Sequence, residues 1–263
     1  MHDTPLRFTE VERSDDGILT VTINRPEVLN ALHLDAHVEL SRIFDGYAAD
    51  PELRVAIITG AGDRGFCVGT DLKSLALTGP YEYPHGGFAG LTTRLDLWKP
   101  VIAAVNGLCL GGGVEILAAA DLAVASAQAE FALPEPQVGL AALGGAALQR
   151  LARDLPLKEA MYLALTGQRI SADEALRIGL VNEIAPRSQV LTRARALARK
   201  ILAGAPLSIE ATKQVMLQSL DQPTLQAALQ AHYPAAQRML ASEDAVEGPL
   251  AFAQKRKPQW KGR

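Results

Sequence analysis

The chain contains few of the residues that build metal sites, disulfide frameworks or nucleophilic thiol sites. Of its 263 residues, two are cysteine, Cys67 and Cys109, and five are histidine. Two cysteines so far apart match no metal-ligand spacing, and one possible disulfide is weak evidence for secretion. We therefore interpret both as reduced, buried thiols and predict no metal site. A nucleophilic cysteine is the alternative, but no histidine stands in a recognisable pairing with either thiol.

An excess of charge of one sign is also missing. The chain has 26 Lys and Arg against 29 Asp and Glu, a net charge of −3. This balance gives no reason to expect a nucleic-acid or membrane partner. Residues 1–5 lack the basic and apolar regions of a signal peptide, so we expect a cytoplasmic protein. The apolar run 101–125 resembles a membrane span, but its carboxylates Glu115 and Asp121 would each cost about 2.5 to 3.5 kcal/mol in a bilayer.

Short apolar runs and helical patterns alternate along the first two thirds of the chain. Strands are predicted over residues 18–23, 55–59, 101–105, 122–125 and 130–132, with a helix over residues 34–47. After Gly144 the pattern changes to helices over residues 146–153, 157–165, 172–178, 191–202, 209–220 and 224–240, with one strand over residues 180–184. We therefore predict an α/β core over residues 1–203 and a helical region over residues 204–263, with the division at Gly204-Ala205-Pro206.

Three consecutive glycines, Gly111 to Gly113, directly precede an apolar run over residues 114–120 that is expected to be a helix. The first N–H groups of a helix lack intrahelical partners and lie at the positive end of its dipole. Such an N–H group can stabilise a carbonyl oxygen that becomes an enolate, with Glu115 overhanging the same point. A simple strand-to-helix turn is the alternative. Neither a dinucleotide fingerprint nor a P-loop fits the spacing.

A second carboxylate, Glu135, follows the expected strand 130–132 in a loop opened by Pro134 and Pro136. A glutamate in such a place is commonly an exposed loop residue. By itself, the position therefore does not separate a catalytic role from a surface role.

Five separated stretches, taken together and in order, resemble the enoyl-CoA hydratase/isomerase family, also called the crotonase family. They are Asn24-Arg25-Pro26 with residues 29–32, residues 65–72, Val105-Asn106-Gly107 with residues 111–115, residues 131–135 with 138–140, and residues 172–176 with 179–182. Each stretch is weak alone, but together they cover nearly the whole chain.

The resemblance implies a crotonase-like spiral of ββα units, followed by a C-terminal helical region that builds a homotrimer, often a dimer of trimers. It also implies an enoyl-CoA hydratase, which adds water reversibly across the double bond of a 2-enoyl-CoA to give a 3-hydroxyacyl-CoA. No separate cofactor is expected, because coenzyme A is part of the substrate.

The resemblance also assigns roles to residues. The backbone N–H groups of Thr70 and Gly112 are expected to form the oxyanion hole for the thioester oxygen. Glu135 is expected to exchange a proton with the α-carbon, while Glu115 orients and deprotonates the water that attacks the β-carbon. Two positioned carboxylates suit this chemistry, because each acid or base contributes on the order of 10²- to 10⁴-fold.

Contacts to coenzyme A are expected from two segments and the C-terminal tail. The residues are Arg25, Val28 and Ala31 at the nucleotide end, Thr70, Asp71, Leu72 and Lys73 along pantetheine and adenine, and Lys255, which corresponds to a lysine that reaches a phosphate, commonly in the neighbouring subunit. As an alternative, Lys73 and Lys255 are solvated surface charges.

The chain departs from the usual family pattern near the expected acyl pocket. Residues 139–146 lack a proline that many members have, and Thr70 replaces a commoner alanine. Tyr81 and Tyr83 indicate a distinctive acyl site. Three alternatives stay open: a carnitinyl-CoA dehydratase-like activity, an enoyl-CoA isomerase that needs only the carboxylate at Glu135, and a non-catalytic acyl-CoA- or RNA-binding member.

Overall fold

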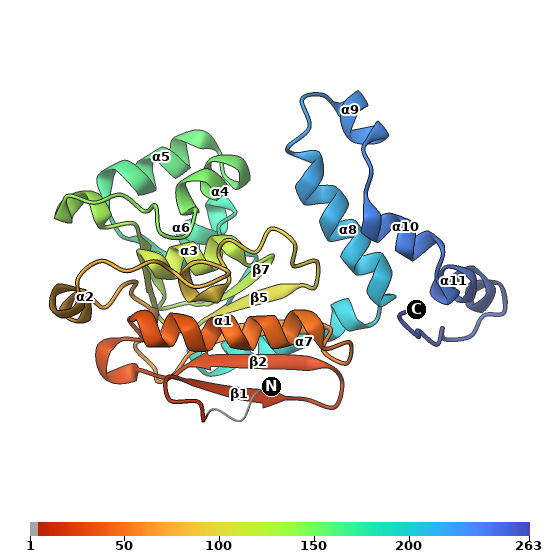
Figure 1. Cartoon of the computed structure of the whole chain (residues 1–263), viewed down its shortest axis with the longest axis horizontal. Coiled ribbons are helices and arrows are strands. Elements are labelled where there is room, and N and C mark those ends of the chain that lie inside the picture. The colour runs from red at the N-terminus through yellow and green to blue at the C-terminus, as the bar shows by residue number, and fades with distance from the viewer. Residues whose placement is uncertain (1–4) are drawn as a thin grey trace.

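The computed structural model describes residues 5–263 and is built on two sheets (Figure 1). Residues 1–4 lie outside the described residues, and the expectation that the chain has no signal peptide rests mostly on them. The larger sheet has the order β1 (Thr9–Arg13), β2 (Ile18–Ile23), β3 (Val55–Gly60), β5 (Val101–Val105), β7 (Leu122–Ser126) and β10 (Glu183–Ala185). The smaller sheet has the order β4 (Gly65–Cys67), β6 (Leu108–Leu110), β8 (Glu130–Ala132) and β9 (Ile170–Ser171).

Helices cover the sheets and form the C-terminal part. The α-helices are α1 (Leu34–Ala49), α2 (Leu72–Thr78), α3 (Gly112–Ala119), α4 (Ala147–Asp154), α5 (Leu157–Thr166), α6 (Ala172–Ile178), α7 (Val190–Leu202), α8 (Pro206–Ser219), α9 (Leu225–Gln230), α10 (Pro234–Leu240) and α11 (Glu243–Ala253). The short 3-10 helices are η1 (Pro26–Val28), η2 (Phe88–Gly90), η3 (Glu135–Val138) and η4 (Arg187–Gln189).

A repeated ββα unit relates the two sheets. Strands β3, β5 and β7 lie side by side and parallel in the larger sheet. Each is followed by a strand of the smaller sheet, β4, β6 or β8, and the first two of these lead into helices α2 and α3. This arrangement confirms the predicted α/β spiral.

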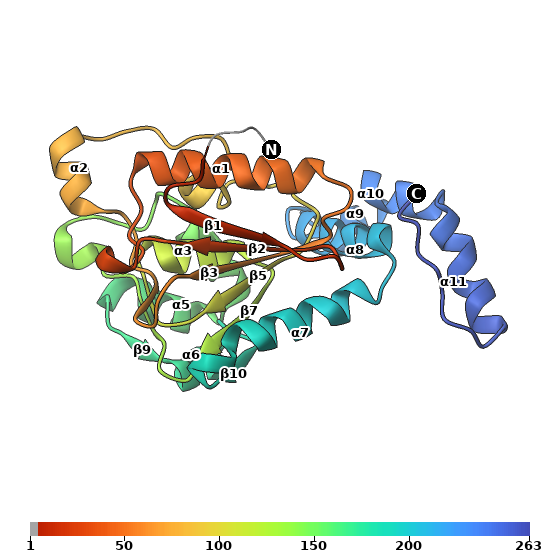
Figure 2. The ribbon, with the colours of Figure 1, turned by 90° about the horizontal axis from the view of Figure 1, so that it is seen from below.

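The central strands β3, β5 and β7 of the larger sheet are buried on both faces, which explains why their sequences are continuously apolar. On β3, Val55 and Ile57 pack with Ala194 of α7, while Ala56 and Ile58 belong to the core on the α1 side. Figure 2 shows α1 and α7 on opposite sides of the sheet. Full burial of each such aliphatic side chain stabilises the fold by about 1.5 to 3 kcal/mol. Because successive side chains of a strand point to opposite faces of the sheet, the same strand packs against α1 on one face and α7 on the other.

Several boundaries differ from the sequence prediction. The helix predicted over residues 224–240 is two helices, α9 and α10, because Pro234 cannot continue a helix and holds Tyr233 in an extended conformation. The strand predicted over residues 180–184 is shorter and lies later, as β10. Strands β1, β4, β6 and β9 and helices α2 and α11 were not predicted.

The apolar run 101–125 consists of strands β5 and β6, helix α3 and most of strand β7. Across residues 5–263, no helix has the length and apolar character needed to cross a bilayer.

Helices α8 to α11 form an arm that projects from the core (Figure 1). The arm begins at Pro206, next to the predicted division at residue 204. It carries large apolar side chains in contact with solvent in the single chain: Met216, Leu225, Leu229, Val246 and Phe252, from 66% to 88% exposed. Such a concentration of exposed apolar side chains is typical of a protein interface.

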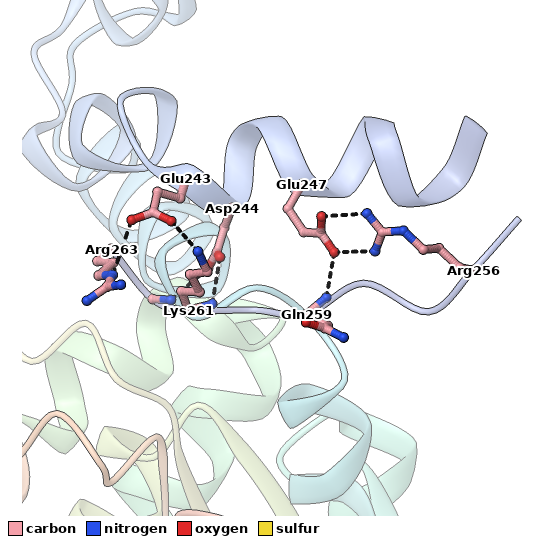
Figure 3. Close-up of polar contacts among 8 residues, drawn as sticks. Glu243, Asp244, Glu247, Arg256, Gln259, Lys261 and Arg263 are labelled. Carbon is pink, nitrogen blue, oxygen red and sulfur yellow. Dashed lines mark hydrogen bonds and ion pairs between the residues drawn. The ribbon is translucent and has the colours of Figure 1, made fainter. Parts of the chain in front are cut away.

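The C-terminal tail folds back along α11 through carboxylates on the first turns of that helix (Figure 3). Asp244, which is 4% exposed, accepts hydrogen bonds from the backbone N–H groups of Lys261 at 2.7 Å and Gly262 at 2.9 Å. Glu247 pairs with Arg256 at 2.6 Å. Glu243 pairs with Lys261 at 2.6 Å, but this pair is exposed. The buried Asp244 is therefore the main anchor of the tail.

We predict that Asp244→Ala releases the tail, because it leaves two backbone N–H groups without their charged acceptor. Hydrogen exchange of the Lys261 and Gly262 amides should accelerate about tenfold or more, since a hydrogen bond to a charged group contributes about 1.5 to 3 kcal/mol. Glu243→Gln removes a neighbouring charge from the same helix turn and is the matched control, with little change expected. Equal exchange in wild type and Asp244→Ala would show that the anchor lies elsewhere.

Candidate active site

The start of α3 lies unusually close to neighbouring backbone. A Cβ atom on Gly113 would lie 2.1 Å from the carbonyl oxygen of Cys67, closer than any side chain allows. Gly111 has φ +53° and ψ −119°, and its N–H donates to the carbonyl of Ala132 at 2.9 Å. The glycines therefore let the first turn of α3 sit between β4 and β8.

Two backbone N–H groups at this place are available as donors. Thr70 lies between Gly69 and Asp71, whose backbone groups both bond Leu32 at 2.8 Å, so the N–H of Thr70 points away from Leu32. Gly112 is the first residue of α3. Within residues 5–263, neither N–H donates to another protein group. A Cβ atom on Gly69 would lie 3.0 Å from the nitrogen of Gly112, which shows how closely the two segments approach.

Thr70 and Gly112 line one cavity of about 310 Å³ together with Glu115 and Glu135. The structure thus brings together the four groups to which the resemblance assigns chemistry. A carbonyl oxygen placed at the two N–H groups would lie beside two carboxylates, an arrangement suited to stabilising an enolate and moving protons next to it.

Glu115 is almost completely buried, with 3% of its surface exposed. Its Oε1 accepts a hydrogen bond from the backbone N–H of Gly145 at 2.7 Å. The pKa of Glu115 is raised to about 7, mainly by burial and in smaller part by the charge of Glu135, while the Gly145 hydrogen bond acts in the opposite direction. A carboxyl group with this pKa can both give and take a proton near neutral pH.

Glu135 is the first residue of η3, directly after β8 and Pro134. Its Oε1 lies 2.8 Å from the position of a Cβ on Gly111, and its Oε2 is buried without a hydrogen-bond partner among the described residues. Burial raises the pKa of this carboxyl group. Glu135 is therefore not an exposed loop acid, because β8 and the turn of η3 direct it into the cavity.

The residues expected to contact coenzyme A are distributed differently. Leu72 lines the cavity, whereas Arg25, Val28, Ala31, Asp71 and Lys73 do not. The Arg25 guanidinium pairs with Asp71 at 3.0 Å and donates to the carbonyl oxygen of Ala31. These contacts tie the turn 25–31 to the start of α2, so the charge of Arg25 is matched within the chain.

The two candidate lysines are both exposed. Lys73 lies in the first turn of α2, near the cavity residue Leu72. Lys255 follows α11 in the arm, has φ +53°, and does not line the cavity of its own chain.

One polar contact of the site was missed by sequence reasoning. The N–H of Gly145 holds Glu115, and a Cβ on Gly145 would lie 2.8 Å from the Cβ of Glu115. The sequence signal was the glycine pair Gly144-Gly145 in the segment that departs from the family pattern. Gly144 also lines the cavity opposite Tyr83, whose hydroxyl would be 2.9 Å from a Cβ at position 144.

A second cavity of about 270 Å³ adjoins the first and shares Glu135, Ala141 and Ala142 with it. Apolar side chains of α4 and α5, including Leu151 and Met161, line this second cavity. Tyr81 and Tyr83 line the first cavity.

The cysteines contribute no reactive group. Cys67 and Cys109 are free and buried, as predicted. Burial raises the pKa of Cys67 to about 12, so its thiol stays protonated. In the part of the chain that the structure describes, no group of three or more His, Cys, Asp or Glu side chains is arranged to hold a metal ion.

Comparison with known proteins gives a consistent result. A model of the enoyl-CoA hydratase/isomerase family matches residues 13–263. Carnitinyl-CoA dehydratase of Escherichia coli K12 is 43% identical over 255 residues, which cover 94% of this chain and 96% of that protein. The carnitinyl-CoA dehydratase of Proteus mirabilis is 42% identical over the same shares of the two chains.

Solved structures agree in fold. The crystal structure of an enoyl-CoA hydratase from Mycobacterium marinum has a TM-score of 0.90 and 41% identity, covering 97% of this chain and 99% of that chain. A carnitinyl-CoA hydratase from Mycobacterium avium has a TM-score of 0.77 and 39% identity, covering 98% and 100%. The chain therefore belongs to the enoyl-CoA hydratase/isomerase family and has the crotonase fold.

Proposed function

We propose that this protein is an enoyl-CoA hydratase that catalyses the reversible addition of water to a 2-enoyl-CoA. The observation that carries the proposal is the single cavity that is lined by the buried Glu115, the partly buried Glu135 and two backbone N–H groups that have no protein acceptor within residues 5–263. Each of these four groups has a distinct task in the reaction.

In the hydration direction, ionised Glu115 takes a proton from water while the water oxygen forms a bond to the β-carbon. The electron pair of the double bond moves toward the thioester, whose oxygen accepts hydrogen bonds from Thr70 and Gly112. Protonated Glu135 then gives its proton to the α-carbon. Loss of one such backbone donor typically costs about 2.7 to 4 kcal/mol of transition-state stabilisation.

The cycle requires that the two carboxyl groups hold one proton between them. Glu115 starts ionised and Glu135 protonated for hydration, and the reverse holds for dehydration. The raised pKa values of both groups support this state, because two ionised carboxylates in one buried cavity repel each other.

Coenzyme A would bind as part of the substrate, with no separate cofactor or metal. Leu72 and the backbone of residues 70–73 would follow the pantetheine, and the turn 25–31, held by the Arg25 and Asp71 pair, would contact the nucleotide. Lys255 would reach a phosphate of the coenzyme A that is bound to a neighbouring copy of the chain. The exposed apolar side chains of the arm support a homotrimer or a dimer of trimers.

A second candidate is a carnitinyl-CoA dehydratase-like activity, which uses the same two glutamates on a different acyl group. The names of the 43% and 42% identical relatives favour it. An isomerase needs only the carboxylate at Glu135, so the buried, hydrogen-bonded Glu115 favours water chemistry. A non-catalytic acyl-CoA- or RNA-binding role does not explain why two carboxylates with raised pKa values line the same cavity.

We predict turnover of at least one of crotonyl-CoA, longer or branched 2-enoyl-CoA substrates and carnitinyl-CoA, followed by the ultraviolet absorbance of the conjugated thioester and by product analysis. Glu135→Gln should lower kcat by on the order of 10²- to 10⁴-fold and leave CoA binding largely intact. Glu130→Gln is the matched control, since it changes an exposed glutamate on β8 that pairs with Arg169.

The panel separates the candidates. Turnover confined to carnitinyl-CoA supports the second candidate, and turnover of simple enoyl-CoA substrates supports the first. No turnover of any member of the panel contradicts both, and full activity of Glu135→Gln removes that residue from its role.

We predict a bell-shaped pH dependence of kcat/KM, because only the singly protonated pair is active. The alkaline limb should fall tenfold per pH unit above about pH 7, where the pair loses its one shared proton, because the pKa of Glu115 is raised to about 7. The acid limb should appear where the pair takes up a second proton, and the raised pKa of Glu135 shifts this limb above the ordinary glutamate range. The profiles should have the same shape for hydration and dehydration, because water addition consumes no net proton. A flat profile from about pH 5 to about pH 9 would contradict the shared proton.

A further inference from the structure

A buried histidine outside the assigned chemistry, His37, faces the active-site segment from α1. The side chain is 0% exposed, and its Nδ1 accepts a hydrogen bond from the backbone N–H of Ala89 at 3.0 Å. Burial lowers the pKa of His37 to about 3, so the ring is neutral and the proton lies on Nε2. The ring therefore acts as an acceptor for the loop, and Nε2 has no polar partner among the described residues.

The loop that His37 bonds has a costly backbone conformation. Ala89, in η2, has φ +53° and ψ 19°, a left-handed geometry that L side chains rarely adopt. The next residue, Gly90, lies so close to α1 that a Cβ there would be 2.3 Å from the Cα of Ser41. The Ala89 amide is buried, and His37 is its only acceptor among residues 5–263. This hydrogen bond therefore stabilises the conformation, because without it the buried N–H would be unpaired.

The side chain of Phe88, in the same loop, lies between His37 and Gly112. Its ring lies 4.5 Å from the His37 ring, centroid to centroid. On the other side, a Cβ on Gly112 would lie 2.3 Å from Cζ of Phe88. The Phe88 ring thus fills the space between His37 and the first residue of α3.

The same imidazole supports the acyl-pocket wall. The rings of His37 and Tyr83 meet edge to face, with centroids 5.1 Å apart and an interplanar angle of 86°. Tyr81 lies 6.0 Å from His37 and meets Tyr83 at 89°. Both tyrosines line the cavity that holds Glu115 and Glu135.

We propose that His37 is a positioning residue that sets the acyl-pocket wall through Tyr83 and the Gly112 donor through Ala89 and Phe88. Its effect on catalysis rests on the proposed function, but its effect on the loop does not. The side chain acts through the loop and touches no reacting atom.

Two substitutions test the hydrogen bond. His37→Leu removes the acceptor nitrogen and puts an apolar side chain of similar size in its place. His37→Asn keeps an oxygen that can accept from the Ala89 N–H near the place of Nδ1. Phe44→Leu is the matched control, because Phe44 is a fully buried residue of the same helix that packs on Tyr47.

The first readout is hydrogen exchange, which does not depend on turnover. Exchange over residues 85–92 should accelerate about tenfold or more in His37→Leu, remain close to wild type in His37→Asn, and be unchanged in Phe44→Leu. The second readout is kinetic. His37→Leu should lower kcat about 10- to 100-fold and change the ratio of kcat for long and short acyl chains, with CoA affinity unchanged and partial recovery in His37→Asn.

The outcomes are distinguishable. If exchange over residues 85–92 in His37→Leu matches that in Phe44→Leu, the positioning role is wrong. If exchange changes as expected but kcat and acyl preference match the control, the link to the site is wrong. If wild type turns over no CoA thioester while exchange changes as expected, the proposed function fails and the support of the loop by His37 stands.

Discussion

The site depends on a steric constraint: no side chain can be present at the start of α3. A Cβ on Gly113 would collide with the carbonyl of Cys67, one on Gly112 with Phe88, and one on Gly111 would lie 2.8 Å from a carboxylate oxygen of Glu135. Three neighbours from three different elements thus contact one bare turn of backbone. Because these elements approach so closely, the N-terminus of α3 with Gly112, the backbone of Thr70 and the carboxylate of Glu135 line the same cavity.

This close packing also creates the electrostatic character of the site. Water is largely excluded from Glu115, and Glu135 lies close enough for its charge to act on Glu115. Burial therefore favours protonated carboxyl groups and shifts their pKa values toward the range in which protons are exchanged at neutral pH. The Gly145 N–H opposes full neutralisation of Glu115, which keeps an ionised form accessible. The close packing around the start of α3 therefore both shapes the cavity and raises the pKa values of its two carboxyl groups.

Some of this arrangement could be predicted from the sequence, since it follows from local pattern. Each of the apolar runs of β3, β5 and β7, and the glycine run before α3, is a continuous stretch of sequence. Hydrophobic pattern and helix-start signals therefore predict them. The contribution of Gly145 was not predicted, because its contact with Glu115 joins residues thirty positions apart. The role of His37 as an acceptor was not predicted either, because it depends on a loop 52 residues away. The break between α9 and α10 was not predicted, although Pro234 is a local signal for it.

The central claim is that Glu135 exchanges a proton with the carbon next to a thioester held by Thr70 and Gly112. The most direct test is the exchange of α-protons of a saturated acyl-CoA, butyryl-CoA, in D₂O, followed by NMR, because no water addition is then involved. The account predicts deuterium incorporation with wild type, retention of most of that exchange in Glu115→Gln, and its loss by about 10²-fold or more in Glu135→Gln. Exchange that survives in Glu135→Gln but disappears in Glu115→Gln would contradict the account.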